Sequence, residues 1–246
     1  MNRIDNINYI TRHLLSGHRA GWQMPSSVIE GQRMMRAAMN VWEPQPLTED
    51  VLRAQDEELA MQRDEKGVVV PQGDGIQLWQ GDITRLKVDA IVNAANAQAL
   101  GCWLPLHNCI DNCIHSAAGV QLRRECAGIM QGRLLKTGDA IITKGYNLPA
   151  RHVIHTVGPV IESGFPTKEQ EEQLAQCYRS CLNLAQENNL ESIAFCCIST
   201  GVFHFPNERA AEIAVSTVKS HQPKRLKTVI FNVFIDKDYD IYKQLL

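Results

Sequence analysis

Residues 76–246 alternate between short apolar runs and longer stretches with helical spacing. The apolar runs are bounded by Gly, Asn, Asp or Thr, which is typical of strands, and they occupy residues 76–82, 90–95, 139–145, 152–158, 192–200 and 228–236. Helical patterns lie between several of them, at residues 111–127, 167–188 and 207–220. This alternation predicts an α/β fold with a mostly parallel sheet covered by helices on both sides. In such sheets ligands bind beyond the carboxyl ends of the strands.

Residues 1–75 have a different pattern. Residues 28–42 and 48–65 have helical spacing of apolar positions and few β-branched runs. Thr48 is a candidate N-cap for the second of these helices. The pattern predicts a helical N-terminal extension that packs on the main body, residues 76–246, because its apolar faces need a partner.

Composition and charge narrow the classes of function. The formal net charge is −2, so the chain lacks the excess of basic side chains that would favour a nucleic-acid partner. The chain has no run of 18 apolar residues and no apolar segment typical of a signal peptide, so we expect no membrane partner and a cytoplasmic location. In that compartment its eight cysteines stay mostly reduced, as core side chains, metal ligands or reactive thiols.

The segment Gly101–His115 contains three cysteines and two histidines directly after a predicted strand. Cys102, His107 and Cys109 have C-x4-H-x-C spacing in a segment that cannot be a plain helix. Thiolate and imidazole together suit Zn²⁺, and three protein ligands leave a position open, as in catalytic sites. The alternative is two buried thiols and a surface histidine. Cys113 and His115 are rival ligands, which we interpret as packing residues.

Other polar residues follow predicted strands. Asp82 comes directly after Gly81, where an Asx-turn is the simplest local interpretation. Asn93 and Asn96 could bind hydroxyl groups or satisfy the backbone of a tight turn.

A further loop follows the predicted strand that ends near residue 198. Ser199, Thr200 and Gly201 precede a helix that Pro206 opens, an arrangement that can hold a phosphate. Phe203 and Phe205 supply flat surfaces beside it.

Four segments together resemble the macrodomain family of ADP-ribose-binding modules. They are GDITRLKVDAIVNAAN, TGDAIITKGYNLPARHVIHTVGP, CISTGVFHFPNERAAEIA and VIFNVFIDKDY, in the family order. The resemblance implies a three-layer α/β fold with a mixed, mostly parallel sheet. Where most members carry a glycine-rich loop and a V-D-G-A-I-H segment, this chain has GCWLPLHNC and IDNCIH. That departure resembles the zinc-containing macrodomains, whose members hydrolyse ADP-ribose from modified proteins and usually carry a helical N-terminal extension.

The resemblance also implies roles for individual residues. Asp82 and Ile83 should meet the adenine, and Phe234 should stack on it. Asn96 should contact the distal ribose, with Asn93 supporting the turn and Asp111 close by. The residues expected around the diphosphate are Ser199, Thr200, Gly201, Val202, Phe203 and His204, with Phe203 against the distal ribose. Cys102, His107 and Cys109 match the zinc ligands.

The predicted function is therefore a zinc-dependent hydrolase that removes mono-ADP-ribose from modified proteins at Asp or Glu esters. Asp111 and Asn96 are the candidate catalytic residues, and one Zn²⁺ per chain is the expected cofactor. Two alternatives stay open. The pocket could only bind ADP-ribose, with a structural zinc, or the enzyme could cleave O-acyl-ADP-ribose. The sequence leaves the role of Asp111 open between taking a proton from water and holding a ribose hydroxyl.

Overall fold

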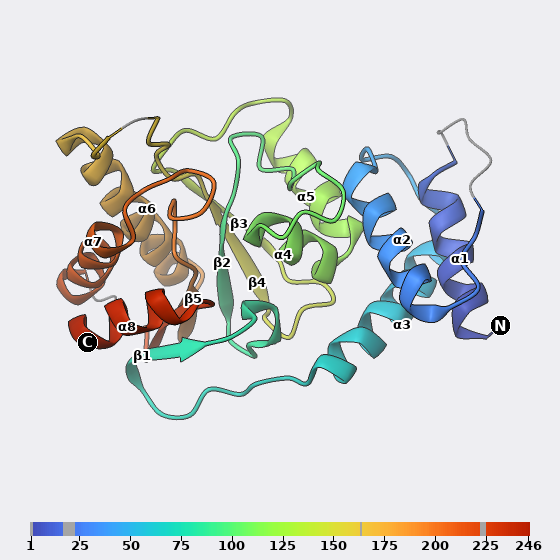
Figure 1. Ribbon diagram of the computed structural model, residues 1–246, viewed down its shortest axis with the longest axis horizontal. Coiled ribbons are helices and arrows are strands. Elements are labelled where there is room, and N and C mark those ends of the chain that lie inside the picture. Colours follow the sequence, from blue (N-terminus) through green and yellow to red (C-terminus); the bar gives the residue numbers. More distant parts are fainter. Residues whose placement is uncertain (1, 17–22, 163, 222–224) are drawn as a thin grey trace.

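The computed structural model describes residues 2–16, 23–162, 164–221 and 225–246. They form a six-stranded mixed sheet in the order β1-β6-β5-β2-β4-β3 (Figure 1). The strands are β1 (Gly75–Gln80), β2 (Ala90–Ala94), β3 (Ala140–Lys144), β4 (His152–Thr156), β5 (Ser192–Phe195) and β6 (Thr228–Val233). Neighbouring strands run parallel except β3, which pairs antiparallel with β4 at one edge. The predicted, mostly parallel sheet is confirmed.

Helices cover both faces of the sheet and complete three layers (Figure 1). One face carries α6 (Lys168–Glu187), α7 (Asn207–Ser220) and α8 (Asp236–Leu245). The other carries α4 (Ile110–Ala118) and α5 (Val120–Met130). The core between the layers is dense in buried aliphatic side chains and includes Tyr178, Phe195 and Phe231.

The single helix predicted over residues 111–127 is two helices. Gly119 separates α4 from α5 with a φ of 101°, which a side chain rarely adopts. A Cβ at this position would lie 2.8 Å from the Gln55 amide nitrogen and 2.7 Å from Gln121 Oε1. The break therefore lets Gln55 of the extension reach the junction, where it accepts a hydrogen bond from the Val120 N–H.

The helices α1 (Arg3–Leu14), α2 (Val28–Val41) and α3 (Glu49–Lys66) form the N-terminal extension and pack around their own apolar cluster. Thr48 is the N-cap of α3 as predicted, since its hydroxyl accepts from the Val51 N–H. Helix α1 was not predicted. Val120 of α5 joins the extension's cluster, and α2 and α3 both contact α4, so the extension lies against the main body.

Within the described ranges no helix is both long enough and apolar enough to cross a membrane.

Candidate active site

The candidate residues that follow predicted strands lie along one edge of the sheet. Asp82 follows β1, Phe234 follows β6, the loop 197–205 follows β5, and Asn96 follows β2. These four strands are consecutive and parallel in the sheet, so their carboxyl ends share an edge. From β1 to β2 is three strand spacings, about 14 Å. The candidate residues therefore form a row, not a single cluster.

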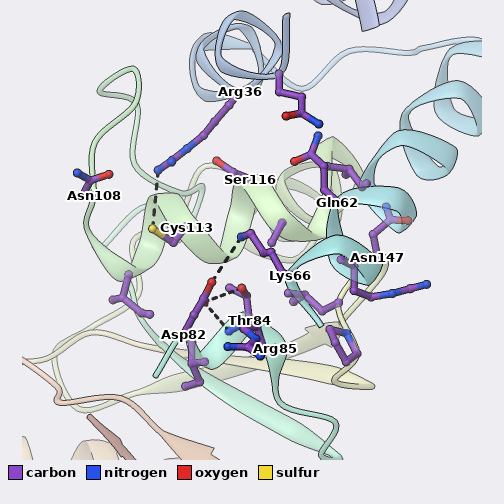
Figure 2. A pocket seen from close by; sticks show the side chains of 18 of the residues that line it. Arg36, Gln62, Lys66, Asp82, Thr84, Arg85, Asn108, Cys113, Ser116 and Asn147 are labelled. Carbon is purple, nitrogen blue, oxygen red and sulfur yellow. Dashed lines mark hydrogen bonds and ion pairs between the residues drawn. The ribbon is translucent and has the colours of Figure 1, made fainter. Parts of the chain in front are cut away.

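The β1 end of the row opens into a cavity of about 900 Å³ between the main body and the extension (Figure 2). Asp82, Ile83 and Phe234, the three residues expected at the adenine, all line it. The Phe234 side chain is free to stack on a ligand, because the residue is 73% exposed. Ile83 itself is buried in the core, so its side chain supports the wall.

Asp82 divides its two carboxylate oxygens between two tasks. Oδ1 accepts from the backbone N–H of Thr84 at 3.0 Å and from its hydroxyl at 2.6 Å, the Asx-type cap expected from local sequence. Oδ2 faces Lys66 Nζ at 3.4 Å (Figure 2). Burial alone would raise the pKa of Asp82, but the bonds from Thr84 and the charge of Lys66 outweigh it and hold the pKa below its usual value. Asp82 is thus a carboxylate with one oxygen facing the cavity.

The loop after β5 has an unusual backbone. Ser199 and His204 adopt φ values of 66° and 58°, in the left-handed region. The loop is closed by the Phe205 N–H, which donates to Ser199 O at 3.0 Å, and tied down by the Ile161 N–H, which donates to Phe203 O at 2.8 Å. Gly201 and Val202 are exposed at its tip. Bent, exposed backbone of this kind can present N–H groups to an anion.

Two expectations for this loop need correction. Phe205 offers no flat surface, because it is 1% exposed and belongs to the main core. Strand β5 ends at Phe195, three residues earlier than predicted, because its pairing with β6 stops at Phe195 and Phe231. Phe203 is half-buried and keeps a partly open face.

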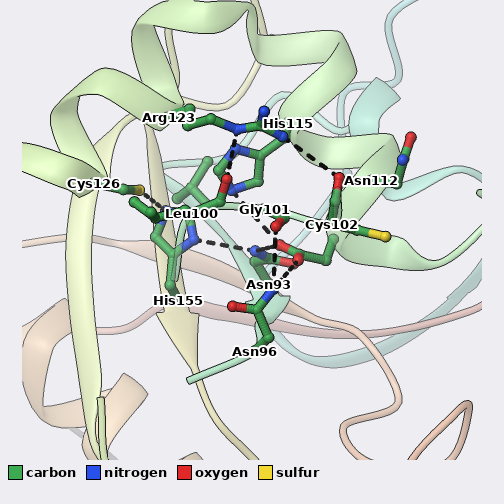
Figure 3. Close-up of polar contacts among 12 residues, drawn as sticks. Asn93, Asn96, Leu100, Gly101, Cys102, Asn112, His115, Arg123, Cys126 and His155 are labelled. Carbon is green, nitrogen blue, oxygen red and sulfur yellow. Dashed lines mark hydrogen bonds and ion pairs between the residues drawn. The ribbon is translucent and has the colours of Figure 1, made fainter. Parts of the chain in front are cut away.

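A buried polar network lies at the end of β2 (Figure 3). Asn93 Nδ2 donates to Asp111 Oδ1 at 2.7 Å, and Asn96 Nδ2 lies 3.4 Å from Asp111 Oδ2. Asn96 also accepts from the Gln98 N–H through its Oδ1, so it stabilises the turn as well. Both asparagine amides therefore converge on Asp111, which is 5% exposed.

Burial controls the charges in this network. It raises the pKa of Asp111 to about 6, against the lowering effects of the Asn93 hydrogen bond and the Arg123 charge. His155 contacts Asn93 at 3.1 Å, and burial lowers its pKa to about 3. His115 lies 3.6 Å from Asp111, and burial with neighbouring positive groups holds its pKa well below the usual range. Both histidines are buried, as expected for His115 as a packing residue, and both are neutral at pH 7.

Cys102, His107 and Cys109 lie together in the loop between β2 and α4. Their ligand atoms are all within 4.8 Å of one another, and Cys102 Sγ lies 3.6 Å from His107 Nδ1. Burial, the largest effect, raises the pKa of the Cys109 thiol to about 12, so a nearby cation is needed to hold it as a thiolate at neutral pH. Two thiols and one imidazole, all half-buried, fit Zn²⁺.

Cys113 is outside this group. Its sulfur lies 3.7 Å from Arg36 Nη2, and the residue lines the cavity, so it is not the core packing residue that the sequence predicts. Among the described residues, a second close group of ligand atoms contains His115, Cys126 and His155. All three are buried. His115 lies beside Asp111, and His155 contacts Asn93.

The extension holds the loop that carries the three ligand atoms, a feature that the sequence does not reveal. Arg36 Nη2 donates to His107 O at 2.8 Å, and Asn40 Oδ1 accepts from the Leu106 N–H at 2.9 Å. Arg123 of α5 lies between the two parts. It donates to Leu100 O in the loop and to three carbonyls at the end of α2, those of Met39, Asn40 and Trp42. Two of the side chains that position the loop, Arg36 and Asn40, are thus more than 60 residues away from their partners in sequence.

The Macro domain family model matches residues 92–214. A protein-ADP-ribose hydrolase of Treponema medium is 49% identical over 99% of this chain and 97% of its own length. The chain belongs to the macrodomain family. A protein-ADP-ribose hydrolase of Staphylococcus aureus (strain MSSA476) is 50% identical to this macrodomain protein over 90% of the chain and 86% of its own length.

Solved structures agree with this assignment. The Oceanobacillus iheyensis macrodomain with ADP has a TM-score of 0.62 and 38% identity, over 71% of this chain and 90% of its own. A Trypanosoma brucei macrodomain in complex with ADP-ribose has a TM-score of 0.62 and 33% identity, over 85% of this chain and 94% of its own. The observed three-layer fold is thus the macrodomain fold.

Proposed function

We propose that this macrodomain is a zinc-dependent hydrolase that releases mono-ADP-ribose from proteins modified at aspartate or glutamate. The coarser part of this function, removal of ADP-ribose from proteins, is supported by relatives of about 50% identity that bear that name. The zinc dependence and the ester linkage rest on the residues of this chain.

One observation carries the proposal: the order of the candidate residues along the sheet edge matches the order of groups along ADP-ribose. Asp82 and Phe234 lie at β1 and β6, where the adenine would bind. The loop 199–204 follows β5 and would wrap the diphosphate. Asn96 and Asp111 lie at the end of β2, next to the three ligand atoms, where the distal ribose would arrive.

The chain's own residues have separable tasks in this arrangement. Cys102, His107 and Cys109 would hold the metal, which supplies Lewis-acid chemistry beside the ester. With three protein ligands, such a metal would have a position free for a ribose oxygen or a water. Binding of the adenine and diphosphate, remote from the reacting bond, holds the ester in place.

Asp111 is suited to orient a group at the distal ribose. Asn93 and Asn96 fix its carboxyl from two sides, so its geometry is set before the substrate binds. With a pKa raised to about 6, it can accept and return a proton near neutral pH. Asn96 fixes the turn that brings the loop to this point, since its Nδ2 donates to Gly101 O at 3.1 Å.

The deciding experiment is the release of ADP-ribose from proteins carrying it on glutamate or on arginine. We expect release from the glutamate ester and none from the arginine linkage. Binding of free ADP-ribose with no release from either linkage would favour the non-catalytic reader. Release from O-acyl-ADP-ribose but not from protein would favour the small-ester deacylase.

Replacing Cys109 by serine should remove most of the bound zinc. A hydroxyl is a poor zinc ligand, and the two remaining ligands do not make a site. Elemental analysis of the purified variant measures this directly. Cys113→Ser is the matched control and should keep one zinc per chain, because its sulfur lies outside the group. Equal zinc in wild type and Cys109→Ser would refute the ligand set.

Replacing Asp82 by alanine should weaken ADP-ribose binding by about 1–3 kcal/mol, the usual loss for a hydrogen bond to a charged group. Calorimetry on wild type, for which we expect a micromolar dissociation constant, and on the variant provides the comparison. Asp82→Asn separates two effects, since its side-chain oxygen can still accept from Thr84 while the negative charge is lost. Unchanged affinity in both variants would place the base elsewhere.

A further inference from the structure

The extension forms the wall of the cavity opposite Asp82. Arg36 of α2, with Gln62 and Lys66 of α3, lines this cavity opposite Asp82 of the main body (Figure 2). If the adenine binds at Asp82, as the proposed function requires, the extension must lie close to the base. The question is which of its side chains reaches the base itself.

Lys66 is the extension residue placed for this contact. Its ammonium group lies 3.4 Å from Asp82 Oδ2, the oxygen that the Thr84 cap leaves free. Among the residues that the structure describes, Lys66 Nζ contacts one acceptor, Asp82 Oδ2. An ammonium group has three N–H donors, so at least two are available to a ligand. The Lys66 side chain is 52% exposed and can adjust to a bound group.

The charges around the cavity agree with this arrangement. Among the described residues that line the cavity, five are cationic and one, Asp82, is a carboxylate. The whole chain is slightly acidic, so this concentration of N–H donors is local. Asp82 is therefore the strong acceptor in a cavity otherwise rich in donors. The edge of an adenine requires an acceptor of this kind next to a donor.

Adenine presents an amino group flanked by ring-nitrogen acceptors, one of which is N7. Asp82 Oδ2 can accept from the amino group, and Lys66 Nζ can donate to the adjacent ring nitrogen. We propose that Lys66 is a base-reading residue that the extension contributes to the ADP-ribose site, paired with Asp82. This inference rests on the proposed function. In this site the extension is part of the binding surface, and the main body alone lacks one of the two charged side chains that contact the edge of the base.

The test combines a side-chain deletion with the deletion of single ring nitrogens. Wild type and Lys66→Met are titrated calorimetrically with ADP-ribose and with its 7-deaza and 1-deaza adenine analogues. We expect Lys66→Met to bind ADP-ribose about tenfold more weakly, because a hydrogen bond from a charged donor is lost. With wild type, one of the two deaza analogues should bind about tenfold more weakly than ADP-ribose does. With Lys66→Met, that analogue and ADP-ribose should bind equally well. Lys87→Met, which replaces an exposed lysine outside the cavity, should bind all three ligands like wild type.

Three results would overturn the inference while leaving the proposed function intact. The first is equal affinity of wild type for ADP-ribose and both analogues. The second is tighter ADP-ribose binding by Lys66→Met, which would mean that Lys66 competes with the base for Asp82. The third is that the loss of affinity caused by Lys66→Met and the loss caused by a deaza analogue add together when both changes are made. A wild-type chain that binds no ADP-ribose at all would instead overturn the proposed function.

Discussion

Replacing His107 by alanine should slow hydrolysis about 10²-fold or more while leaving ADP-ribose affinity within a few fold. The size of the rate loss is that expected when one electrostatic stabiliser of the transition state is removed. The small change in affinity follows from position, because the adenine cavity and the loop 199–204 do not include the three ligand atoms. An interaction made mainly in the transition state lowers the rate without a matching loss of ground-state binding.

Of the three candidate ligands, His107 can be replaced without removing a known anchor of the loop. Its carbonyl, not its side chain, accepts from Arg36, so the alanine variant keeps the backbone anchor of the loop. The measurement is single-turnover release of ADP-ribose from a glutamate-modified protein, with calorimetry and zinc content on the same sample. His221→Ala, at the end of α7, is the matched histidine control. A folded, zinc-free His107→Ala that hydrolyses at the wild-type rate would show that the zinc is structural.

Replacing Arg123 by methionine should lower the free energy of unfolding by about 3–5 kcal/mol. The side chain is 3% exposed and binds carbonyls of both the extension and the loop. Methionine fills a similar volume but leaves several buried carbonyl groups without a donor, each at about 1–3 kcal/mol when fully unpaired. Burial lowers the pKa of Arg123 to about 10, so the side chain still carries its positive charge at neutral pH.

Urea unfolding followed by circular dichroism gives this free energy. A chain of this size should show a Tm lower by about 10 °C for such a loss. Arg124→Met is an unusually close control, since the neighbouring arginine is exposed and its replacement should change stability by less than about 0.5 kcal/mol. Arg123→Met should also retain less zinc, because the loop loses its link to α2. A stability equal to that of Arg124→Met would contradict the role we assign to Arg123.

Much of the fold could be predicted because local sequence encodes it. Apolar runs bounded by turn residues marked all six strands, and the helical spacing over residues 207–220 matched the bounds of α7. The misses have physical causes. Helix α1 is rich in polar residues and depends on packing against α2 and α3. The break at Gly119 depends on the approach of Gln55, which is distant in sequence and therefore invisible to periodicity.

The candidate site divides in the same way. The spacing of Cys102, His107 and Cys109 within eight residues allowed the metal group to be predicted, and the three ligand atoms do lie together. Arg36, Asn40 and Lys66 were missed because nothing near them in the sequence is distinctive. Each acts on a partner at least 16 residues away, and such contacts arise only when the extension packs on the main body. The zinc itself and the roles of individual residues stay predictions.

Because α2 anchors the loop that carries Cys102, His107 and Cys109, a shortened chain would lose that anchor. Translation from an internal start codon at Met61 would still encode the whole sheet, Asp111 and all three ligand atoms. The shorter product would match the family model over the same residues, 92–214. It would nevertheless lack Arg36 and Asn40, so its loop would have neither the donor for His107 O nor the acceptor for Leu106 N–H. A start at Met61 would therefore leave the recognisable motif intact and remove the residues that hold the loop in place.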